Sequence, residues 1–364
     1  MKGGYQGYGE TGHAPLFAGA IREGAPLLGM NVSDSAAHDA FLAADVGGTY
    51  ARIGLIAFGS NEHAPTVLAY RVYKCADHAD LESILHTFCD ELRAKPDRLI
   101  LACAGFMHDD VVVNNNLRWQ VAPITLAKNL GFKSVNVIND FEALAYGTSY
   151  LDASNVKTLH RPDNMDEVRG PVVIVGPGTG LGVAVRFPDA RPAVLATEAG
   201  HIQLAARTGR EQHVLGELAP ANTHVPYDEI LSGPGLLRLY RALCRLERLP
   251  AVFQEPVAIT AAACAGSNVR AVEALQMFCG WLGSYVGDLA MLYGATGGIY
   301  IAGGFLSQIS DFVEKSSFVS RFLDKGVVRP FLQTVPVHVV EHAQLGVMGA
   351  ACWMKDRCMR YNNA

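Results

Sequence analysis

Hydrophobic residues in the first part of the chain occur in short runs whose spacing alternates between that of strands and that of helices. Strand-like runs cover residues 41–44, 53–58, 98–103, 111–115 and 134–140. Helical spacing covers residues 81–93 and 141–150, and Asn139 is suited to cap the second helix, with Glu142 three residues later. This mixed order of strands and helices predicts an α/β layer fold.

A second region with the same alternation begins at the strand-like run 171–175 and continues to the end of the chain. Its longest element is a helical stretch whose apolar residues lie three and four positions apart: Val272, Leu275, Cys279, Leu282, Val286, Leu289 and Tyr293. Such heptads also occur in coiled coils, but the flanking strands and internal glycines favour a helix that faces the core. Strands at 298–304 and 335–340 and a last helix from Leu345 follow.

The length of 364 residues is sufficient for two domains of ordinary size. Because no low-complexity linker separates the two regions, we place the boundary in the helix at 141–150. The prediction is a small α/β domain at 41–145 and a large one at 146–364, whose C-terminal helix can pack back on the small domain. Residues 1–40 are rich in Gly and Ala and are expected to form a poorly ordered extension.

Composition narrows the kind of partner. Half of the residues are hydrophobic, 18% are charged, and the net charge of −5 gives no basic surface for nucleic acid or an anionic membrane. No apolar run approaches the ~18 residues of a membrane span, and no secretory signal is recognised. The eight cysteines form no C-x-x-C pair, which favours free thiols in a reducing cytoplasm.

The most informative motif is DVGGTYAR at 45–52, a glycine turn between two strand-like runs. The pair Gly47 and Gly48 accepts a tight turn and exposes backbone N–H groups that can converge on a phosphate. Asp45 could hold a metal-bound water, and Thr49 could supply a hydroxyl group. Taken alone, the motif fits an ordinary hairpin turn equally well.

A second glycine motif, GPGTGLG at 176–182, also joins a strand to a strand-like run. A Rossmann turn would need a helix after the glycines, and the chain contains no G-x-x-x-x-G-K-[S/T] phosphate loop. Two glycine hairpins, one early in each half, suggest a duplicated architecture that clamps a polyanion. A flexible surface turn is the alternative, but four alternating glycines are more than a simple turn requires.

These two hairpins, together with GGIYIAGG at 297–304, resemble the phosphate and adenosine motifs of the actin-like ATPase superfamily, which includes sugar kinases. The motifs NDFEA at 139–143, EAGH at 198–201 and LSGPG at 231–235 narrow the resemblance to the bacterial glucokinase family. The resemblance covers residues 41–355. It implies a two-domain actin-like (ribonuclease H-like) ATPase fold with duplicated mixed β-sheet domains, transfer of the γ-phosphoryl group of ATP to the 6-hydroxyl of glucose, and a homodimer.

The resemblance also implies roles for individual residues. Asp140 is expected to be the general base, and Asp45 to bind Mg²⁺, through water. The expected glucose ligands are Asn116, Asn139, Asp140, Glu198, His201 and Asp228. The expected ATP ligands are Asp45, Gly47, Gly48, Thr49, Arg52, Gly176, Gly178, Thr179, Gly180, Gly303 and Gly304. From the residues alone, Asp140 or Asn139 would more simply cap a helix, and EAGH would form a surface turn.

One position departs from the family pattern. The family usually has Glu four residues before the Ser of LSGPG, where this chain has Asp228, followed by Glu229. The shortened side chain leaves open a kinase for another hexose, such as mannose, fructose or an N-acetylated sugar. A sugar-sensing regulator without catalysis is the alternative from another class. ATP, ADP and polyphosphate are not distinguished as donors, and residues 202–218 lack the cysteine-rich zinc motif of the related repressor/open-reading-frame/kinase family.

Overall fold

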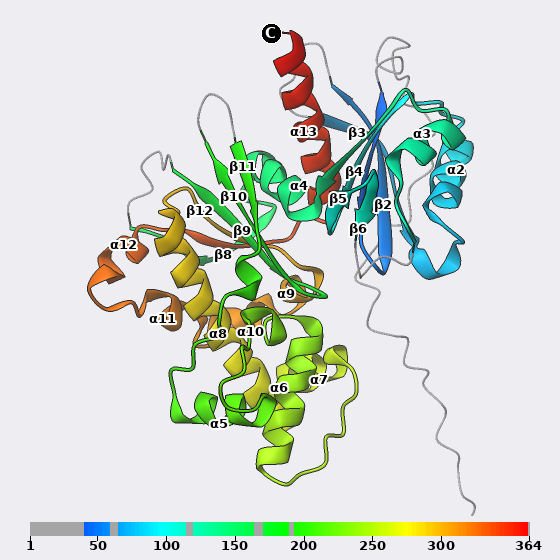
Figure 1. Ribbon diagram of the computed structural model, residues 1–364. Coiled ribbons are helices and arrows are strands. Elements are labelled where there is room, and N and C mark those ends of the chain that lie inside the picture. The colour runs from blue at the N-terminus through cyan, green and yellow to red at the C-terminus, as the bar shows by residue number, and fades with distance from the viewer. Residues whose placement is uncertain (1–39, 59–64, 114–118, 164–169, 189–192, 363–364) are drawn as a thin grey trace, which may run out of the picture.

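The computed structural model describes residues 40–58, 65–113, 119–163, 170–188 and 193–362. Two mixed β-sheets form its framework, and two helices lie between them (Figure 1). The predicted sugar ligand Asn116 lies outside the described residues, as does the predicted extension except Ala40. Among the described helices, none combines the length and the apolar character needed to cross a membrane.

The first sheet has the strand order β3-β2-β1-β4-β7. Its strands are β1 (Phe41–Val46), β2 (Tyr50–Phe58), β3 (Pro65–Lys74), β4 (Arg98–Cys103) and β7 (Ser134–Asn139). Strands β1, β2 and β3 form an antiparallel meander, whereas β1, β4 and β7 run parallel. Helices α2 (Leu81–Leu92) and α3 (Pro123–Leu130) cover one face, and β5 (Phe106–His108) pairs with β6 (Val111–Val113) to form a small ribbon.

The second sheet repeats this arrangement with the order β11-β10-β9-β12-β13-β8. Its strands are β8 (Val156–His160), β9 (Val172–Pro177), β10 (Leu181–Phe187), β11 (Ala193–Thr197), β12 (Gly298–Ile301) and β13 (Val337–Val340). Again a three-stranded antiparallel meander is followed by strands parallel to its first member. The predicted α/β class with duplicated mixed sheets is therefore confirmed.

The remaining helices belong to the second half of the chain: α8 packs on β9 and β12, and most of the others pack on α8 or on one another. They are α5 (Gly209–Leu218), α6 (Gly233–Leu246), α7 (Pro256–Cys264), α8 (Val269–Tyr293), α9 (Gly304–Gln308), α10 (Ser310–Lys315), α11 (Phe318–Leu323) and α12 (Arg329–Gln333). Single 3₁₀ turns are η1 (Cys75–Asp77), η2 (Thr148–Tyr150), η3 (Ala199–His201), η4 (Tyr227–Glu229) and η5 (Gly326–Val328). The central heptad residues of α8 are fully buried in one core, so the predicted core-facing helix is correct.

Helices α4 (Asp140–Gly147) and α13 (Leu345–Asn362) lie between the sheets (Figure 1). Helix α13 packs its apolar side on β1 and β4, whereas α4 packs on β9, β10 and β11. The two helices meet at small residues: a Cβ added to Gly349 would lie 1.7 Å from the carbonyl oxygen of Ala143. Only glycine permits so close a crossing, which fixes the relative position of the two helices at this point.

Among the predicted boundaries that differ from the structure, two lie next to the site. The helix predicted at 141–150 is α-helical only to Gly147, and the turn η2 completes it. The strand predicted at 298–304 ends at Ile301, because Gly303 has φ +143° and turns the chain into α9. Such a φ value favours glycine. Both differences are at element ends, where sequence patterns carry least information.

Candidate active site

The carboxyl ends of three parallel strands form one side of the site. Val46 of β1 pairs with Cys103 of β4, which pairs with Asn139 of β7. This register places Asp45 and Asp140 at the same edge of the first sheet. In α/β sheets, that edge is where ligands bind.

Asp140 is held by the first turn of α4. Its Oδ1 atom accepts a hydrogen bond from the backbone N–H of Phe141, at 3.0 Å. Burial, and after it the negative charge of the nearby Asp45, raise the pKa of this carboxyl to about 6. The hydrogen bond acts in the opposite direction but does not cancel these effects. Asp140 is therefore a partly buried carboxyl whose pKa, at about 6, lies close to neutral pH.

Asp45 is surrounded by groups that favour negative charge. Its Oδ2 atom lies 3.5 Å from Nη1 of Arg52, on the neighbouring strand. The same oxygen would lie 2.7 Å from a Cβ on Gly346, so the N-terminal end of α13 lies against this carboxylate. Burial nevertheless raises the pKa of Asp45, with Arg52 opposing the shift. A divalent cation at this position would relieve the burial of the negative charge.

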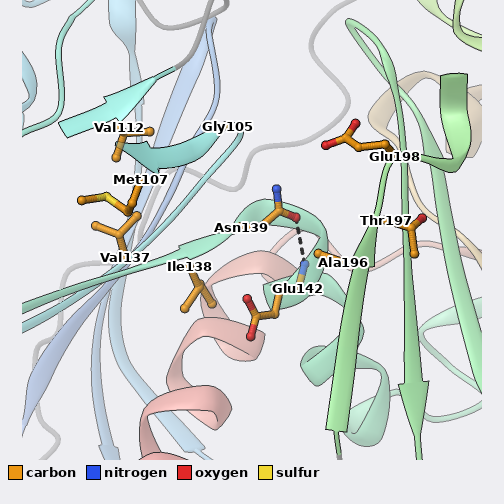
Figure 2. Close-up of a pocket in the computed structure, with 10 residues that line it drawn as sticks. All are labelled: Gly105, Met107, Val112, Val137, Ile138, Asn139, Glu142, Ala196, Thr197 and Glu198. Atoms are coloured by element: carbon orange, nitrogen blue, oxygen red, sulfur yellow. Dashed lines mark hydrogen bonds between the residues drawn. The ribbon is translucent and has the colours of Figure 1, made fainter. Parts of the chain in front are cut away.

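Asn139 combines the role of a helix cap with a position in the cleft. Its Oδ1 atom accepts hydrogen bonds from the N–H groups of Phe141 and Glu142, at 2.9 and 3.2 Å. These bonds cap α4, as predicted. Because they use only the side-chain oxygen, the amide nitrogen remains directed into the cleft (Figure 2). The cap and the ligand interpretations are thus compatible.

A cavity of about 320 Å³ separates the two sheets at this point. Its lining residues are Gly105, Met107, Val112, Val137, Ile138, Asn139, Glu142, Ala196, Thr197 and Glu198. Figure 2 shows the Glu198 carboxylate directed toward Asn139 from the opposite side. Glu198 is 93% exposed and lies 3.9 Å from His201 Nε2, whose side chain is 64% exposed. The second-sheet side of the cavity is therefore open to solvent.

The turn between β1 and β2 is held by hydrogen bonds within the turn and to Cys75. Gly47 N–H donates to the carbonyl oxygen of Tyr50 at 3.0 Å, and Cys75 N–H donates to that of Thr49 at 2.9 Å. The Cys75 thiol also lies 3.4 Å from the Gly47 carbonyl oxygen. Cys75 was not singled out in the sequence, since a lone buried cysteine gives no local signal. Thr49 itself is exposed at the tip of the turn.

The turn between β9 and β10 is held by the segment before α6. Asp228 Oδ1 accepts the N–H of Leu181 at 2.6 Å, and Gly233 N–H donates to the carbonyl oxygen of Gly178 at 2.8 Å. Asp228 therefore lies against the second glycine hairpin. Its neighbour Glu229 forms an ion pair with Arg238.

The third glycine motif lies beside the second hairpin. Ala302 N–H donates to the carbonyl oxygen of Val175 at 2.8 Å. A Cβ on Gly303 would lie 2.6 Å from the carbonyl oxygen of Pro177, whereas one on Gly304 would meet nothing within 4 Å. Gly303 thus permits a close backbone approach, and Gly304 is at the start of a short helix.

The carboxylates near the first glycine turn are suited to a magnesium ion that is bound mainly through a nucleotide. Within the described part of the chain, no three His, Cys, Asp or Glu side chains gather into a metal cluster. Mg²⁺ commonly uses only one or two carboxylates together with substrate phosphates and waters. Asp45, a partly buried carboxylate beside the first glycine turn, suits that role.

Comparison with known proteins gives consistent matches over nearly the whole described chain. The glucokinase family model matches residues 42–357. A glucokinase-like protein of Xylella fastidiosa is 43% identical over 320 residues, covering 87% of this chain and 95% of that protein. A glucokinase of Yersinia pestis is 35% identical over 318 residues, covering 87% and 96%.

Among solved structures, the glucokinase from an Antarctic psychrotroph is 34% identical, with a TM-score of 0.76. The match covers 87% of this chain and 99% of that structure. The duplicated sheets thus have the actin-like ATPase fold that the resemblance implied. From the family match and these relatives, it follows that the chain belongs to the glucokinase family.

Proposed function

We propose that this protein transfers the γ-phosphoryl group of ATP to the 6-hydroxyl of glucose, with Asp140 as the general base. The observation that carries the proposal is the position and charge of this carboxyl, which follows β7 at the cleft and has a pKa of about 6. Such a carboxyl is ionised at neutral pH and is a stronger base than an ordinary aspartate. The glucokinase name of the Yersinia pestis relative supports glucose as the acceptor.

Glucose is proposed to bind in the cavity between the sheets. The proposed ligands are Asn139, Asp140, Glu198 and His201, with Asn116 and Asp228 added from the resemblance. Amide and carboxylate groups on both sides of the cavity can pair with the donors and acceptors of sugar hydroxyls. A cavity of about 320 Å³ is at the lower end of the usual range for small-molecule sites.

ATP is proposed to bind with its phosphates between the glycine turns. Its proposed ligands are Asp45, Gly47, Gly48, Thr49, Arg52, Gly176, Gly178, Thr179, Gly180, Gly303 and Gly304. When bound with the nucleotide, Mg²⁺ would neutralise phosphate charge, and Asp45 would hold it through water. The 6-hydroxyl oxygen bonds to the γ-phosphorus as the bond to ADP breaks, and Asp140 accepts the hydroxyl proton. The Phe141 N–H keeps the receiving carboxyl oriented.

We further propose that the domains at residues 41–145 and 146–364 approach each other and close around the sugar. The exposure of Glu198 and His201 supports this, because both side chains must lose water to bind glucose tightly. Small-angle scattering would test the motion: the radius of gyration should fall when glucose is added. A homodimer remains a prediction, which analytical ultracentrifugation tests directly.

The proposal is tested by a coupled assay of glucose 6-phosphate formation with Mg-ATP. Mannose, fructose and N-acetylglucosamine should then be compared as acceptors, by ADP release, and ADP and polyphosphate as donors. We expect glucose with ATP to give the highest kcat/KM. A higher value with another hexose would overturn the glucose assignment, and absence of turnover with every sugar would favour the non-catalytic regulator.

A kinase for another hexose is the second candidate, and one observation favours it. Asp228 Oδ1 is already bonded to the Leu181 N–H, so this side chain has less capacity for a sugar hydroxyl than a longer Glu would have. A sugar site with one weaker ligand would discriminate less between epimers. The acceptor panel separates the two candidates.

A further inference from the structure

The alternating glycines of the second hairpin have different neighbours. Gly176 and Gly182 face each other as a pair in the β9–β10 ladder. A Cβ on Gly182 would lie 2.0 Å from Cε2 and 2.1 Å from Cδ2 of Phe141, and one on Gly176 would lie 2.6 Å from Cζ of the same ring. At Gly178, by contrast, the nearest atom would be 3.9 Å away.

The backbone does not explain the paired glycines. Neither Gly176 nor Gly182 is among the glycines with positive φ, so another residue could adopt both conformations. The Phe141 ring is therefore the reason that Gly182 has no side chain. Gly176 has a second reason, because its Cβ would also lie 2.9 Å from the carbonyl oxygen of Ala302. Gly182 is consequently the cleaner position for a test.

Phe141 connects this hairpin to the acidic end of β7. Its ring lies against the two glycines, while its backbone N–H donates to Asp140 Oδ1 at 3.0 Å and to Asn139 Oδ1 at 2.9 Å. One residue thus touches the proposed phosphate hairpin with its side chain and the proposed base with its main chain. A displacement of the hairpin would move the ring and, with it, the peptide that orients the carboxyl.

We propose that Phe141 is a positioning residue that sets Asp140 in register with the second glycine hairpin, and that Gly176 and Gly182 accommodate its ring. The inference rests on the proposed function for the role of Asp140. The division of the glycines follows from it: Gly182 serves the packing of Phe141, whereas Gly178 belongs to the turn itself, where its N–H donates to the carbonyl oxygen of Gly180 at 2.7 Å.

The packing is tested by a double-mutant cycle read by thermal unfolding, which does not require activity. Gly182→Ala should lower the unfolding midpoint by at least about 3 °C, because the new methyl group overlaps the ring. Phe141→Val removes the overlapping ring atoms, so in that background Gly182→Ala should cost less than half as much. Gly178→Ala is the matched control, with the same effect in both backgrounds. An equal cost of Gly182→Ala in both backgrounds would overturn the packing assignment.

The positioning role is tested by kinetics of Phe141→Val with glucose and Mg-ATP. We expect kcat to fall about 10- to 100-fold, since small displacements of reacting groups have effects of this size, and the KM for glucose to change less than about threefold. Phe322→Val is the control, because Phe322 is fully buried in α11, where its ring lies 5.7 Å from that of His160 on β8; its kcat should equal that of the wild type. Equal kcat values for the two variants would overturn the role of Phe141. A wild-type protein without turnover would instead overturn the proposed function, while the unfolding cycle would still report the packing.

Discussion

Replacing Asp140 with Asn should make the protein less active and, at neutral pH, more stable. The substitution keeps a side-chain oxygen that can accept the Phe141 N–H, and it removes the ionisable group. The wild-type carboxyl has a pKa of about 6 in the folded protein, against 3.8 for an unperturbed aspartate. A pKa above the unfolded value means that the ionised carboxylate destabilises the folded protein.

The sign of the stability change follows from the protonation state of the carboxyl in the folded and unfolded chains. Below pH 3.8 the carboxyl is protonated in both the folded and the unfolded chain, so it costs nothing. Above about pH 6 it is ionised in both, and the folded state carries the full cost. A shift of about two pH units corresponds to about 3 kcal/mol, which is an upper limit because the side chain borders the cleft. Asp140→Asn should therefore raise the free energy of unfolding by about 1–3 kcal/mol at pH 8.

The assay is denaturant unfolding of both proteins at pH 4, 6 and 8, together with glucose phosphorylation at pH 8. The stability difference should shrink toward zero at pH 4, and turnover of Asp140→Asn should fall at least about 100-fold. In the wild type, kcat/KM should decline tenfold per pH unit below about pH 6. A variant that is less stable at pH 8, or a difference that does not depend on pH, would refute the electrostatic argument. Near-normal turnover would refute Asp140 as the base.

Three other substitutions test separate contacts. Asn139→Ala removes the cap of α4 and should lower the free energy of unfolding by about 1–2 kcal/mol, measured by denaturant titration; no loss would contradict the capping role. Gly346→Ala would bring a methyl group within 2.7 Å of the Asp45 carboxylate, so kcat should fall at least about tenfold in Mg-ATP saturation curves, and unchanged kinetics would show that this approach is not needed. Asp228→Ala removes the acceptor of the Leu181 N–H and should raise the KM for ATP more than the KM for glucose; the reverse order would identify Asp228 as mainly a sugar ligand.

The glycine turns were predictable because their signal is local. Alternating apolar residues on both sides of residues 45–52 and 176–182 predict strands, and the glycines between them mark a turn. Both hairpins are present, with Asp45 opposite Arg52 and Gly176 opposite Gly182 in their ladders. The core-facing stretch of α8 was predictable for the same reason, since burial of one helix face sets the period.

Contacts between distant segments could not be read from the pattern. Asp228 and Leu181 are 47 positions apart, and no periodicity indicates that a carboxylate will accept a particular backbone N–H. Gly346 meets Asp45 only because α13 passes from the second sheet to the first. The sequence argument assigned all four alternating glycines to phosphate binding. In the structure Gly182 lies against the Phe141 ring, whereas Gly178 has no such neighbour, so the glycines of this motif do not all have the same structural cause.

In the closure that we propose, the position of α4 determines which groups move. Its N-terminal end follows β7 of the first sheet, and its body packs on β9, β10 and β11 of the second. The close crossing of Gly349 with Ala143 would oppose sliding of α13 past α4, so the proposed closure would be mainly a rotation about this region. Asp140 is at the start of α4, close to the axis of such a rotation, whereas Glu198 lies across the cavity. Closure would then carry Glu198 toward the sugar and displace the proposed base least, which keeps the proton acceptor aligned in both states.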